Sequence, residues 1–427
     1  PEYLELVENL NNLGAVPIRD VATNPKRKFK PQKDKVFQYI EISEVDISTG
    51  EYNKGEILGE NAPDRAQWIV KQNDVIISTV RPVRNAVSLV REDIENLVCS
   101  SGFAILEAEK IEPEYLFAYL KTRPIIELLD RKTTATMYPA IMVEDILETK
   151  IYLGNQKFRE EVKNLVVESQ KELENSKSLY SQAESLLLEE LGLKDFESEG
   201  GLWSVINLSE AKKANRLDAE YFQSKYEKLI SKIKIKNKDI QTLETFIKTY
   251  STGFSFKSEN YQETGIPLIR INNIRKGYID LSNSAYLSEK DFLLSPKDTA
   301  NSGDIVLSMS GTIGMTAIIS DDIVKCSINQ RILKITPKDK DIDKNYLVLL
   351  LNSIIGSYQL ERIGTGGVQT NISYKDIKSI LIPILPKQIQ QKIAELVKKS
   401  HEARQKAKNL LEEAKEKVEG LIENSNK

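Results

Sequence analysis

The stretch "KQIQQKIAELVKKSHEARQKAKNLLEEAKEKVEGLIE", residues 387–423, is charged, free of proline and decisive for the architecture of this chain. Apolar or small residues recur in it at alternating steps of four and three, which is the pattern of a helix packed along another helix. At about 1.5 Å per residue the helix is roughly 50 Å long, and it cannot bury its stripe alone. The stripe consists of Ile389, Ile393, Leu396, Ser400, Ala403, Ala407, Leu410, Ala414, Lys417 and Leu421.

A second segment of the same kind, residues 156–191, is the natural packing partner. It carries a weaker stripe in the same register and a neighbouring stripe that begins at Val166. We therefore expect two long antiparallel helices that form a coiled-coil spacer. Their predicted interface comprises Leu165, Leu173, Leu179, Ala183 and Leu186 with Ile393, Leu396, Ala403, Ala407, Leu410 and Ala414. The alternative is that each helix lies on its own domain, which the length and the narrow stripe disfavour.

The chain also contains an internal repeat. "NDVIISTVRPVRNAVSLV" (73–90) resembles "GDIVLSMSGTIGMTAIIS" (303–320) at an offset of 230 residues, and "YLFAYLKTRPIIELLDR" (115–131) resembles "YLVLLLNSIIGSYQLER" (346–362) at 231. Strands are expected at 36–42, 75–80, 86–90, 103–106, 266–271, 305–309, 315–319 and 331–335, and short helices at 112–121 and 343–352. The predicted fold class is α+β, with two β-rich mixed domains, two long antiparallel helices and a pseudo-twofold internal repeat.

Composition excludes several classes of protein. The 427 residues carry a net charge of −3, so any contact with nucleic acid must be local. The single histidine, His401, leaves no His/Cys metal cluster and no histidine-dependent triad in the body of the chain, so neither a metal site nor a catalytic site is predicted. No apolar run approaches the roughly 20 residues of a membrane span. Cys99 and Cys326 are too few for a disulfide framework, which favours a cytoplasmic protein with two core cysteines.

Side chains that bind DNA cluster in the predicted loops of both halves. Arg and Asn or Gln pair bidentately with guanine and adenine, whereas Lys serves phosphates. Each cluster alone is typical of a solvated surface, but clusters recur at corresponding places in the two halves. The first half offers Lys26, Arg27, Lys28, Lys30, Arg81, Arg84, Lys132, Thr133, Thr134 and Tyr138. The second half offers Arg270, Asn272, Asn273, Arg275, Lys276, Thr312, Gln330, Arg331, Arg362, Thr365, Gln369, Thr370 and Asn371.

The glycine-rich stretch "GTGGVQTNIS" (364–373) raises the question of a nucleotide site. No strand–GxxxxGK[ST]–helix unit occurs, and the corresponding stretch of the first half, "TTATMYPAIM" (133–142), has no glycine. The glycine-rich loop therefore faces DNA or merely shapes the entry to the last strand; the sequence leaves both readings open.

Several of these stretches resemble a known family. "LSMSGTIGMTAII" (307–319), "INQRILKITP" (328–337), "GGVQTNISYKDIKSILIPILPKQIQQKIAELV" (366–397) and "NRLDAEYFQSKY" (215–226) look like the specificity subunit of type I restriction–modification systems. The resemblance covers the whole chain twice over, although the first half departs from it at "STVRPVRN" (78–85). It implies two target-recognition domains, 1–155 and 219–386, a central spacer helix at 156–191, a linker at 192–218 and a C-terminal spacer helix at 387–427.

The resemblance also implies a function. The chain is expected to be non-catalytic and to bind no cofactor itself. Each recognition domain is expected to read one half of a bipartite, asymmetric site in double-stranded DNA. The helices would set the gap and dock two methyltransferase subunits, which bind S-adenosylmethionine, and restriction subunits that use ATP and Mg²⁺ would join that core. Two other readings are a fragment of a fused restriction–methylation enzyme, for which no NPPY-like motif is present, and a scaffold of two β-rich lobes that never touches nucleic acid.

Overall fold

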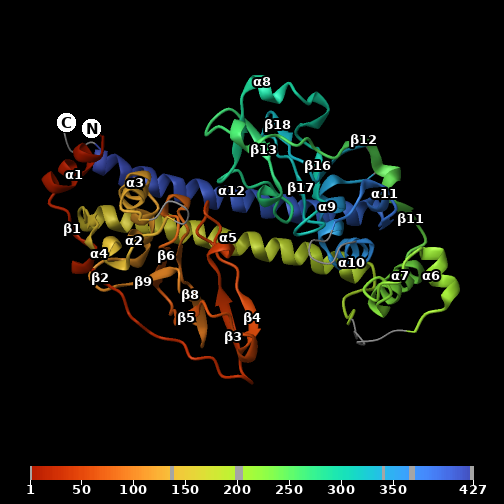
Figure 1. The fold of residues 1–427 in the computed structure, drawn as a ribbon, viewed down its shortest axis with the longest axis horizontal. Coiled ribbons are helices and arrows are strands. Elements are labelled where there is room, and N and C mark those ends of the chain that lie inside the picture. Colours follow the sequence, from red (N-terminus) through yellow and green to blue (C-terminus); the bar gives the residue numbers. More distant parts are fainter. Residues whose placement is uncertain (1, 135–138, 198–204, 339–341, 365–370, 424–427) are drawn as a thin grey trace. The chain divides into compact units, whose positions relative to one another are not determined.

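The computed structural model describes residues 2–134, 139–197, 205–338, 342–364 and 371–423 as a mixed α+β fold. The chain divides into two compact units. Unit 1 comprises Pro1–Glu174 and Ala403–Lys427, and unit 2 comprises Asn175–Glu402. The two long helices, α5 (Gln156–Glu190) and α12 (Lys387–Glu423), lie where the sequence predicts them, and each contributes residues to both units (Figure 1). None of the helices within the described ranges combines the length and the apolar character that a membrane span requires.

In unit 1 the described residues form two four-stranded sheets, ordered β2-β9-β6-β7 and β4-β3-β8-β5. Only one neighbouring pair in these sheets, β3 with β8, is parallel. The strands are β1 (Val16–Pro17), β2 (Ala22–Thr23), β3 (Val36–Ile40), β4 (Gly55–Leu58), β5 (Ala66–Ile69), β6 (Asp74–Ser78), β7 (Val87–Leu89), β8 (Leu97–Ser100), β9 (Phe103–Ala108) and β10 (Lys150–Ile151), where β1 pairs with β10. The short helices are α1 (Glu2–Asn12), α2 (Pro113–Leu120), α3 (Arg123–Arg131) and α4 (Val143–Glu148).

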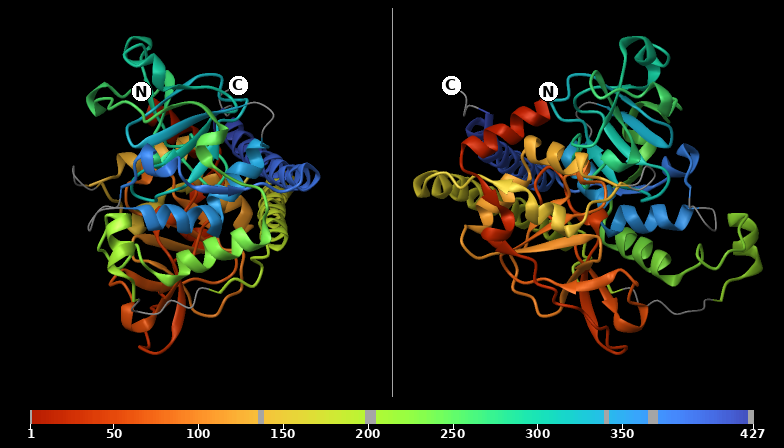
Figure 2. Two further views of the ribbon diagram at one scale, coloured as in Figure 1. Left: turned by 90° about the vertical axis from the view of Figure 1, so that its right-hand side faces the viewer. Right: turned by 60° about the vertical axis from the view of Figure 1, so that its left-hand side comes forward.

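The sheet β2-β9-β6-β7 is the middle layer of unit 1. Its strands carry apolar side chains on both faces, and both faces are covered. Side chains alternate between the two faces of a strand. Val75 and Ile77 of β6 pack with α2 in one core cluster, whereas Ile76 packs with Leu97 of the second sheet in another. Such double burial explains why β6 reads as an uninterrupted apolar run. Helix α2 and the second sheet thus cover opposite faces of the same sheet (Figures 1 and 2).

Unit 2 has sheets of the same strand order, β12-β19-β16-β17 and β14-β13-β18-β15. Here too one pair, β13 with β18, is parallel. The strands of the described part are β11 (Ile240–Thr242), β12 (Ile247–Ser251), β13 (Ile266–Ile269), β14 (Ala285–Leu287), β15 (Thr299–Ala300), β16 (Ile305–Ser308), β17 (Thr316–Ile318), β18 (Cys326–Ile328), β19 (Ile332–Pro337) and β20 (Leu381–Pro383). The short helices are α6 (Leu208–Ala214), α7 (Ser224–Lys236), α8 (Glu289–Phe292), α9 (Lys344–Asn352), α10 (Ile354–Ile363) and α11 (Tyr374–Ile377).

The middle layer of unit 2 is built in the same way. Ile305 and Leu307 of β16 pack with α9 in one cluster, and Val306 packs with Cys326 of the second sheet in another. A buried hydrogen bond also recurs 231 residues apart. The hydroxyl of Tyr115 in α2 donates to the carbonyl oxygen of Tyr152 at 2.6 Å, and that of Tyr346 in α9 donates to the carbonyl oxygen of Pro383 at 2.8 Å.

The buried stripes of the long helices differ from the predicted register. Of the predicted interface residues, Leu173, Ala183, Ile393, Ala403, Ala407 and Ala414 are buried, whereas Leu165, Leu179, Leu186, Leu396 and Leu410 are half-buried. Their places in the stripe are taken by the next residues, Val166, half-buried Tyr180, Leu187, Val397 and Leu411. On α12 the buried residues from Ile393 to Ile422 follow the 3.6-residue period of a straight helix and not the 3.5-residue period of a supercoil.

Within unit 1, segments of α5 and α12 lie side by side and antiparallel. Lys417 pairs with Glu161 at 4.0 Å, and further along Lys406 pairs with Glu168 at 3.1 Å. The buried Ser169 hydroxyl donates to the carbonyl oxygen of Ala407 at 2.7 Å. A hydroxyl can reach the backbone of the other helix only if the helices approach closely. Within unit 2, the hydroxyls of Ser176 and Ser400 lie 3.1 Å apart.

Replacing Ser169 by leucine tests this close approach. Ser169 is 2% exposed, so the larger side chain must push the helix segments apart, and we expect Ser169→Leu to lower the free energy of unfolding by about 1–3 kcal/mol. Urea denaturation of the full chain measures the effect. The matched control is Val167→Leu on the exposed side of α5, which should change it by less than about 0.5 kcal/mol. Equal stability of the two variants would show that the helices leave room at Ser169.

Candidate nucleic-acid interface

In each unit the middle sheet ends in a corner where a hairpin turn, a strand connection and a distant loop meet. In unit 1 this corner, called corner 1, consists of the β6–β7 turn (79–85), Gly102 before β9 and Ala140. The amide of Thr79 donates to the carbonyl oxygen of Gly102 at 2.8 Å, and the amide of Ile141 donates to that of Thr79 at 2.9 Å. Arg81 and Arg84 of the turn belong to corner 1, and Thr134 forms a β-bridge with Ala140. Several predicted residues of the first half are therefore brought together.

Unit 2 repeats these bonds in corner 2, which consists of the β16–β17 turn (309–314), Arg331 before β19 and Asn371. The amide of Met309 donates to the carbonyl oxygen of Arg331 at 2.9 Å, and the amide of Ile372 donates to that of Met309 at 3.0 Å. The guanidinium of Arg331 binds the side-chain oxygen of Asn371. Predicted residues Thr312, Gln330, Arg331 and Asn371 all lie at corner 2, and the first three are exposed.

The basic loop of the first half lies along β5 as an extended segment. The amide of Phe29 donates to Gln67, and the amide of Ile69 donates to Arg27. Because side chains alternate in such a segment, Lys26, Lys28 and Lys30 are exposed. Arg27 turns inward and binds both carboxylate oxygens of buried Asp74, at 2.8 and 2.7 Å. Arg27 thus has a structural partner in Asp74, and its role in DNA binding stays a prediction.

Three predicted residues of the second half also have structural partners. Asn273 is 1% exposed and donates to Asp280 and Ser284, so its prediction as a base-reading residue is wrong. Arg270 donates to the carbonyl oxygen of Asn283. Arg362 pairs with Glu227 at 2.5 Å.

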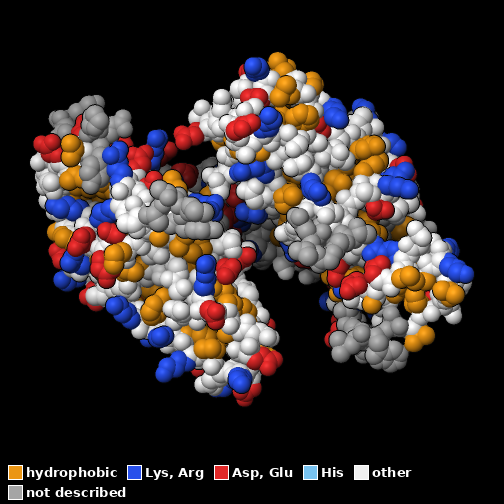
Figure 3. Space-filling model, viewed as in Figure 1, with side chains coloured by type: hydrophobic (Ala, Val, Ile, Leu, Met, Phe, Trp, Pro, Cys, Tyr) orange, Lys and Arg blue, Asp and Glu red, His pale blue; other side chains and the backbone are white. Residues whose placement is uncertain are grey.

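The other predicted residues are distributed over loops. Lys132 is half-buried and donates to the carbonyl oxygen of Asp145, and neighbouring Thr133 is half-buried as well. Arg275 pairs loosely with Asp280 at 3.7 Å, while Asn272 and Lys276 are exposed. Tyr138, Thr365, Gln369 and Thr370 lie outside the described residues, and so does most of the glycine-rich stretch. On the face of the molecule that Figure 3 shows, Lys and Arg side chains are interspersed with Asp and Glu.

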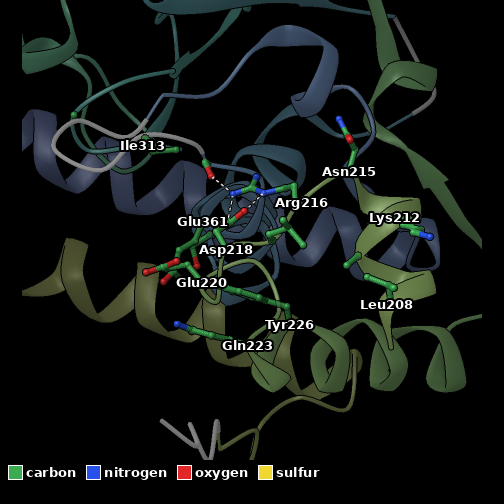
Figure 4. A pocket seen from close by; sticks show the side chains of 15 residues that line it. Leu208, Lys212, Asn215, Arg216, Asp218, Glu220, Gln223, Tyr226, Ile313 and Glu361 are labelled. Carbon is green, nitrogen blue, oxygen red and sulfur yellow. Dashed lines mark hydrogen bonds and ion pairs between the residues drawn. The ribbon is translucent and has the colours of Figure 1, made fainter. Parts of the chain in front are cut away.

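A hollow of about 1320 Å³ lies in unit 2 beside α6 and the C-terminal end of α10. Arg216 lies in it and pairs with Asp218 at 2.5 Å, which lowers the pKa of that carboxyl (Figure 4). Arg216 also donates to the carbonyl oxygens of Ile363 and Gly364, so it closes the end of α10. The ring of Tyr221 lies within 4.7 Å of Arg216 and 4.6 Å of Arg362. These contacts hold the linker on α10. The guanidinium of Arg362 is engaged there by Tyr221 and Glu227.

The two cysteines are inert core residues, as predicted. Cys99 and Cys326 are both fully buried and free. Burial raises the pKa of Cys99 well above its usual range and that of Cys326 to about 12, so neither thiol ionises near neutral pH. Across the described ranges no group of three or more His, Cys, Asp or Glu side chains is placed to hold a metal ion.

Comparison with known proteins relates the part of the chain that contains corner 2 to a known family. Residues 234–416 match the model of the family described as "Type I restriction modification DNA specificity domain". This part of the chain is similar to a type I DNA specificity domain. Strands β12 to β19, the hairpin turn and Arg331 all fall within the specificity domain, whereas corner 1 precedes it.

Specificity subunits of type I restriction enzymes are relatives of the chain. It is 28% identical over 179 residues to the MjaVIII specificity subunit of Methanocaldococcus jannaschii, which covers 40% of this chain and 42% of that one. It is 26% identical over 180 residues to the EcoAI subunit of Escherichia coli, covering 40% and 29%. The matched part therefore spans less than half the length of each relative.

Two solved structures align over most of the chain. The HsdS subunit of Thermoanaerobacter tengcongensis is 19% identical with a TM-score of 0.36, covering 96% of each chain. The type I restriction–modification S subunit of M. genitalium is 15% identical with a TM-score of 0.39, covering 96% of this chain and 95% of that one.

Lys121 supports corner 1 and was missed by the sequence analysis. It is 1% exposed, and its ammonium donates to the carbonyl oxygens of Ile47 at 2.9 Å and Asn85 at 3.5 Å. The side-chain amide of Asn85 returns a hydrogen bond to the carbonyl oxygen of Lys121, which anchors the hairpin turn on α2. A lysine after an apolar helix reads as a solvated terminus, so only the structure reveals its burial.

Burial of Lys121, with Lys415 nearby, lowers its pKa to about 7, although Asp46 and Glu412 oppose the shift. Between pH 7 and about 10.5 the unfolded chain then binds more protons at Lys121 than the folded chain. The free energy of unfolding should therefore rise with pH across this window, by up to about 1.4 kcal/mol per pH unit. Denaturation of wild type and Lys121→Met at pH 7, 8.5 and 10 tests this. The variant should lack this part of the rise, and parallel curves would contradict it.

Proposed function

We propose that this chain is the DNA-specificity subunit of a type I restriction–modification complex, in which each unit reads one half of a bipartite, asymmetric site. The observation that carries the proposal is the strand order of the sheets. The specificity domain matches residues 234–416 only, yet the sheets of unit 1 have the same orders and the same single parallel pair as those of unit 2. Two domains of one architecture in one chain suit a target with two parts.

The exposed side chains support DNA as the ligand. Phosphate contacts position a protein on DNA, and base contacts supply the specificity. Lys26, Lys28 and Lys30 form an exposed row suited to phosphates. Corner 2 offers Thr312, Gln330 and Arg331, which are side chains that hydrogen-bond to base edges. A net charge of −3 adds no general attraction to DNA, so the binding must come from these local groups.

The long helices suit a ruler and a docking platform. We propose that α5 and α12 set the distance between the half-sites and bind two methyltransferase subunits. Those partners, and not this chain, would supply S-adenosylmethionine, and restriction subunits would supply ATP and Mg²⁺ chemistry. The chain itself would position the DNA and contribute no catalytic group.

Methylome sequencing of a host that expresses this chain with its methyltransferase subunit tests the function. We expect methylation at one bipartite motif with a fixed gap, because two recognition units at a fixed distance read two fixed half-sites. A host that expresses the methyltransferase alone is the control and should lack this motif. An unchanged methylome, with the complex shown to be assembled, would refute the proposal.

The ruler role has its own test. Removing seven matched residues from α5 and seven from α12 shortens the helices by about 10 Å, which is roughly three base pairs of B-DNA. Methylome sequencing should then recover both half-sites with a shorter gap. The control removes the same number of residues from the 192–218 linker and should keep the gap. An unchanged gap in the helix variant, with the complex active, would exclude the helices as the ruler.

A further inference from the structure

Left-handed backbone conformation singles out two arginines. Apart from glycines, the described residues with positive φ are Asn73, Asn85, Asn96, Asn215, Arg81 and Arg331. Asparagine tolerates this conformation because its short polar side chain can hydrogen-bond locally. Arginine lacks the short side chain of asparagine, and its Cβ meets the following carbonyl oxygen. Arg81 at φ 50° and Arg331 at φ 67° are therefore the two residues of this set that require another explanation.

Both arginines lie at the corners, but at different backbone positions. The hydrogen bonds of Thr79 to Gly102 and of Met309 to Arg331 correspond, so Arg331 occupies the place of Gly102. The next correspondence places Arg81 where corner 2 has Gly311, because Val80 and Ser310 form the equivalent β-bridges to Ala140 and Asn371. At these two positions each corner thus has one arginine and one glycine, exchanged between the units.

Corner 2 shows that the fold can take a glycine at the position of Arg81. Gly311, at φ +70°, occupies the position of Arg81, and glycine adopts such a backbone without steric cost. Arg331 is exposed, and its guanidinium reaches Asn371 at the edge of corner 2. Residues that keep a strained backbone conformation, where glycine would remove the strain, are typical of functional sites. The recurrence of one strained arginine at each corner points to a shared task.

We propose that Arg81 and Arg331 are specificity-determining residues, each of which reads a guanine in the half-site of its own unit. This inference rests on the proposed DNA-recognition function. A guanidinium pairs bidentately with O6 and N7 of guanine, which is the commonest specific contact in the major groove. Because arginine and glycine are exchanged between the corners, the guanidinium comes from the β6–β7 turn in unit 1 and from the residue before β19 in unit 2. The two half-sites are then read by non-equivalent geometries, which suits an asymmetric target.

The test uses the full chain in complex with its methyltransferase and duplexes that carry the motif found by methylome sequencing, together with every single-base-pair substitution. Arg81→Gly and Arg331→Gly keep the backbone conformation and remove the side chain. Each variant should lose about ten- to a hundredfold discrimination at one G·C pair. The two affected pairs should lie in different half-sites. Arg19→Ala, which removes an exposed arginine of unit 1 outside corner 1, is the control and should retain wild-type discrimination.

An exchange variant separates the guanidinium from its backbone position. A Cβ at Gly311 would meet only Ile271 Cγ2, at 3.9 Å, so the surroundings leave room for Gly311→Arg, which would carry the same backbone strain at φ +70° as Arg81 does. Adding it to Arg331→Gly returns a guanidinium to corner 2 from the hairpin side, as in corner 1. The double variant should again discriminate a G·C pair in the half-site of unit 2, and no discrimination there would contradict the assignment of the effect to the guanidinium.

The outcomes distinguish this inference from the function on which it rests. A wild-type complex that methylates no bipartite motif refutes the function. A wild-type complex with such a motif, and glycine variants that keep full discrimination, refute the inference alone. Equal weakening on all duplexes would identify phosphate contacts and would also overturn base reading. Thermal melting of both glycine variants at or above the wild-type temperature excludes misfolding as the cause of a loss.

Discussion

Burial of one sheet on both faces is the constraint on which the rest of each unit depends. In β6 and β16 alternate side chains enter two different cores, one beneath a helix and one beneath a second sheet. Such a strand cannot shift by one residue without exchanging the contents of the two cores. Its ends are therefore fixed in space, and the turns that follow β6 and β16 are held by the same hydrogen bonds in both units. Variable side chains can be placed on these turns without loss of the layers beneath them.

Strong local patterns made much of the fold predictable. The apolar runs of β6, β9, β16 and β19 and the long proline-free helices could be read directly, because double burial and helix length leave clear signals. The strands β4, β5 and β14 could not, because they are only three or four residues long and carry no long continuous apolar run. The predicted stripe of the long helices differs from the buried stripe by one residue over part of its length. The reason is that the buried stripe follows the period of a straight helix and not that of a supercoil.

The candidate site was harder to predict than the fold because residue type does not reveal a side chain's partner. Arg362 and Arg331 look alike in the sequence, but one pairs with Glu227 and lies against Tyr221, while the other is exposed at corner 2. Asn273 was sought at a base edge and is buried in the structure, where it satisfies backbone groups of its own loop. Lys121 gave no signal at all, because its burial depends on Ile47 and Asn85 from other parts of the chain.

The last residues of α12 belong to the core of the first unit. Leu411, Ala414, Val418 and Ile422 are buried in the same cluster as α2 and β6, and Arg404 binds Asp46 and Glu51 of the same unit at 2.6 and 2.8 Å. Domains generally fold in order during synthesis, starting from the N-terminus. Here the core of the first unit is complete only after synthesis of Ala403–Lys427, which lies more than 200 residues downstream of Glu174. The second unit is synthesised before that segment. A chain that terminates within α12 would therefore lose the unit translated first, while the unit translated last would keep most of its own residues.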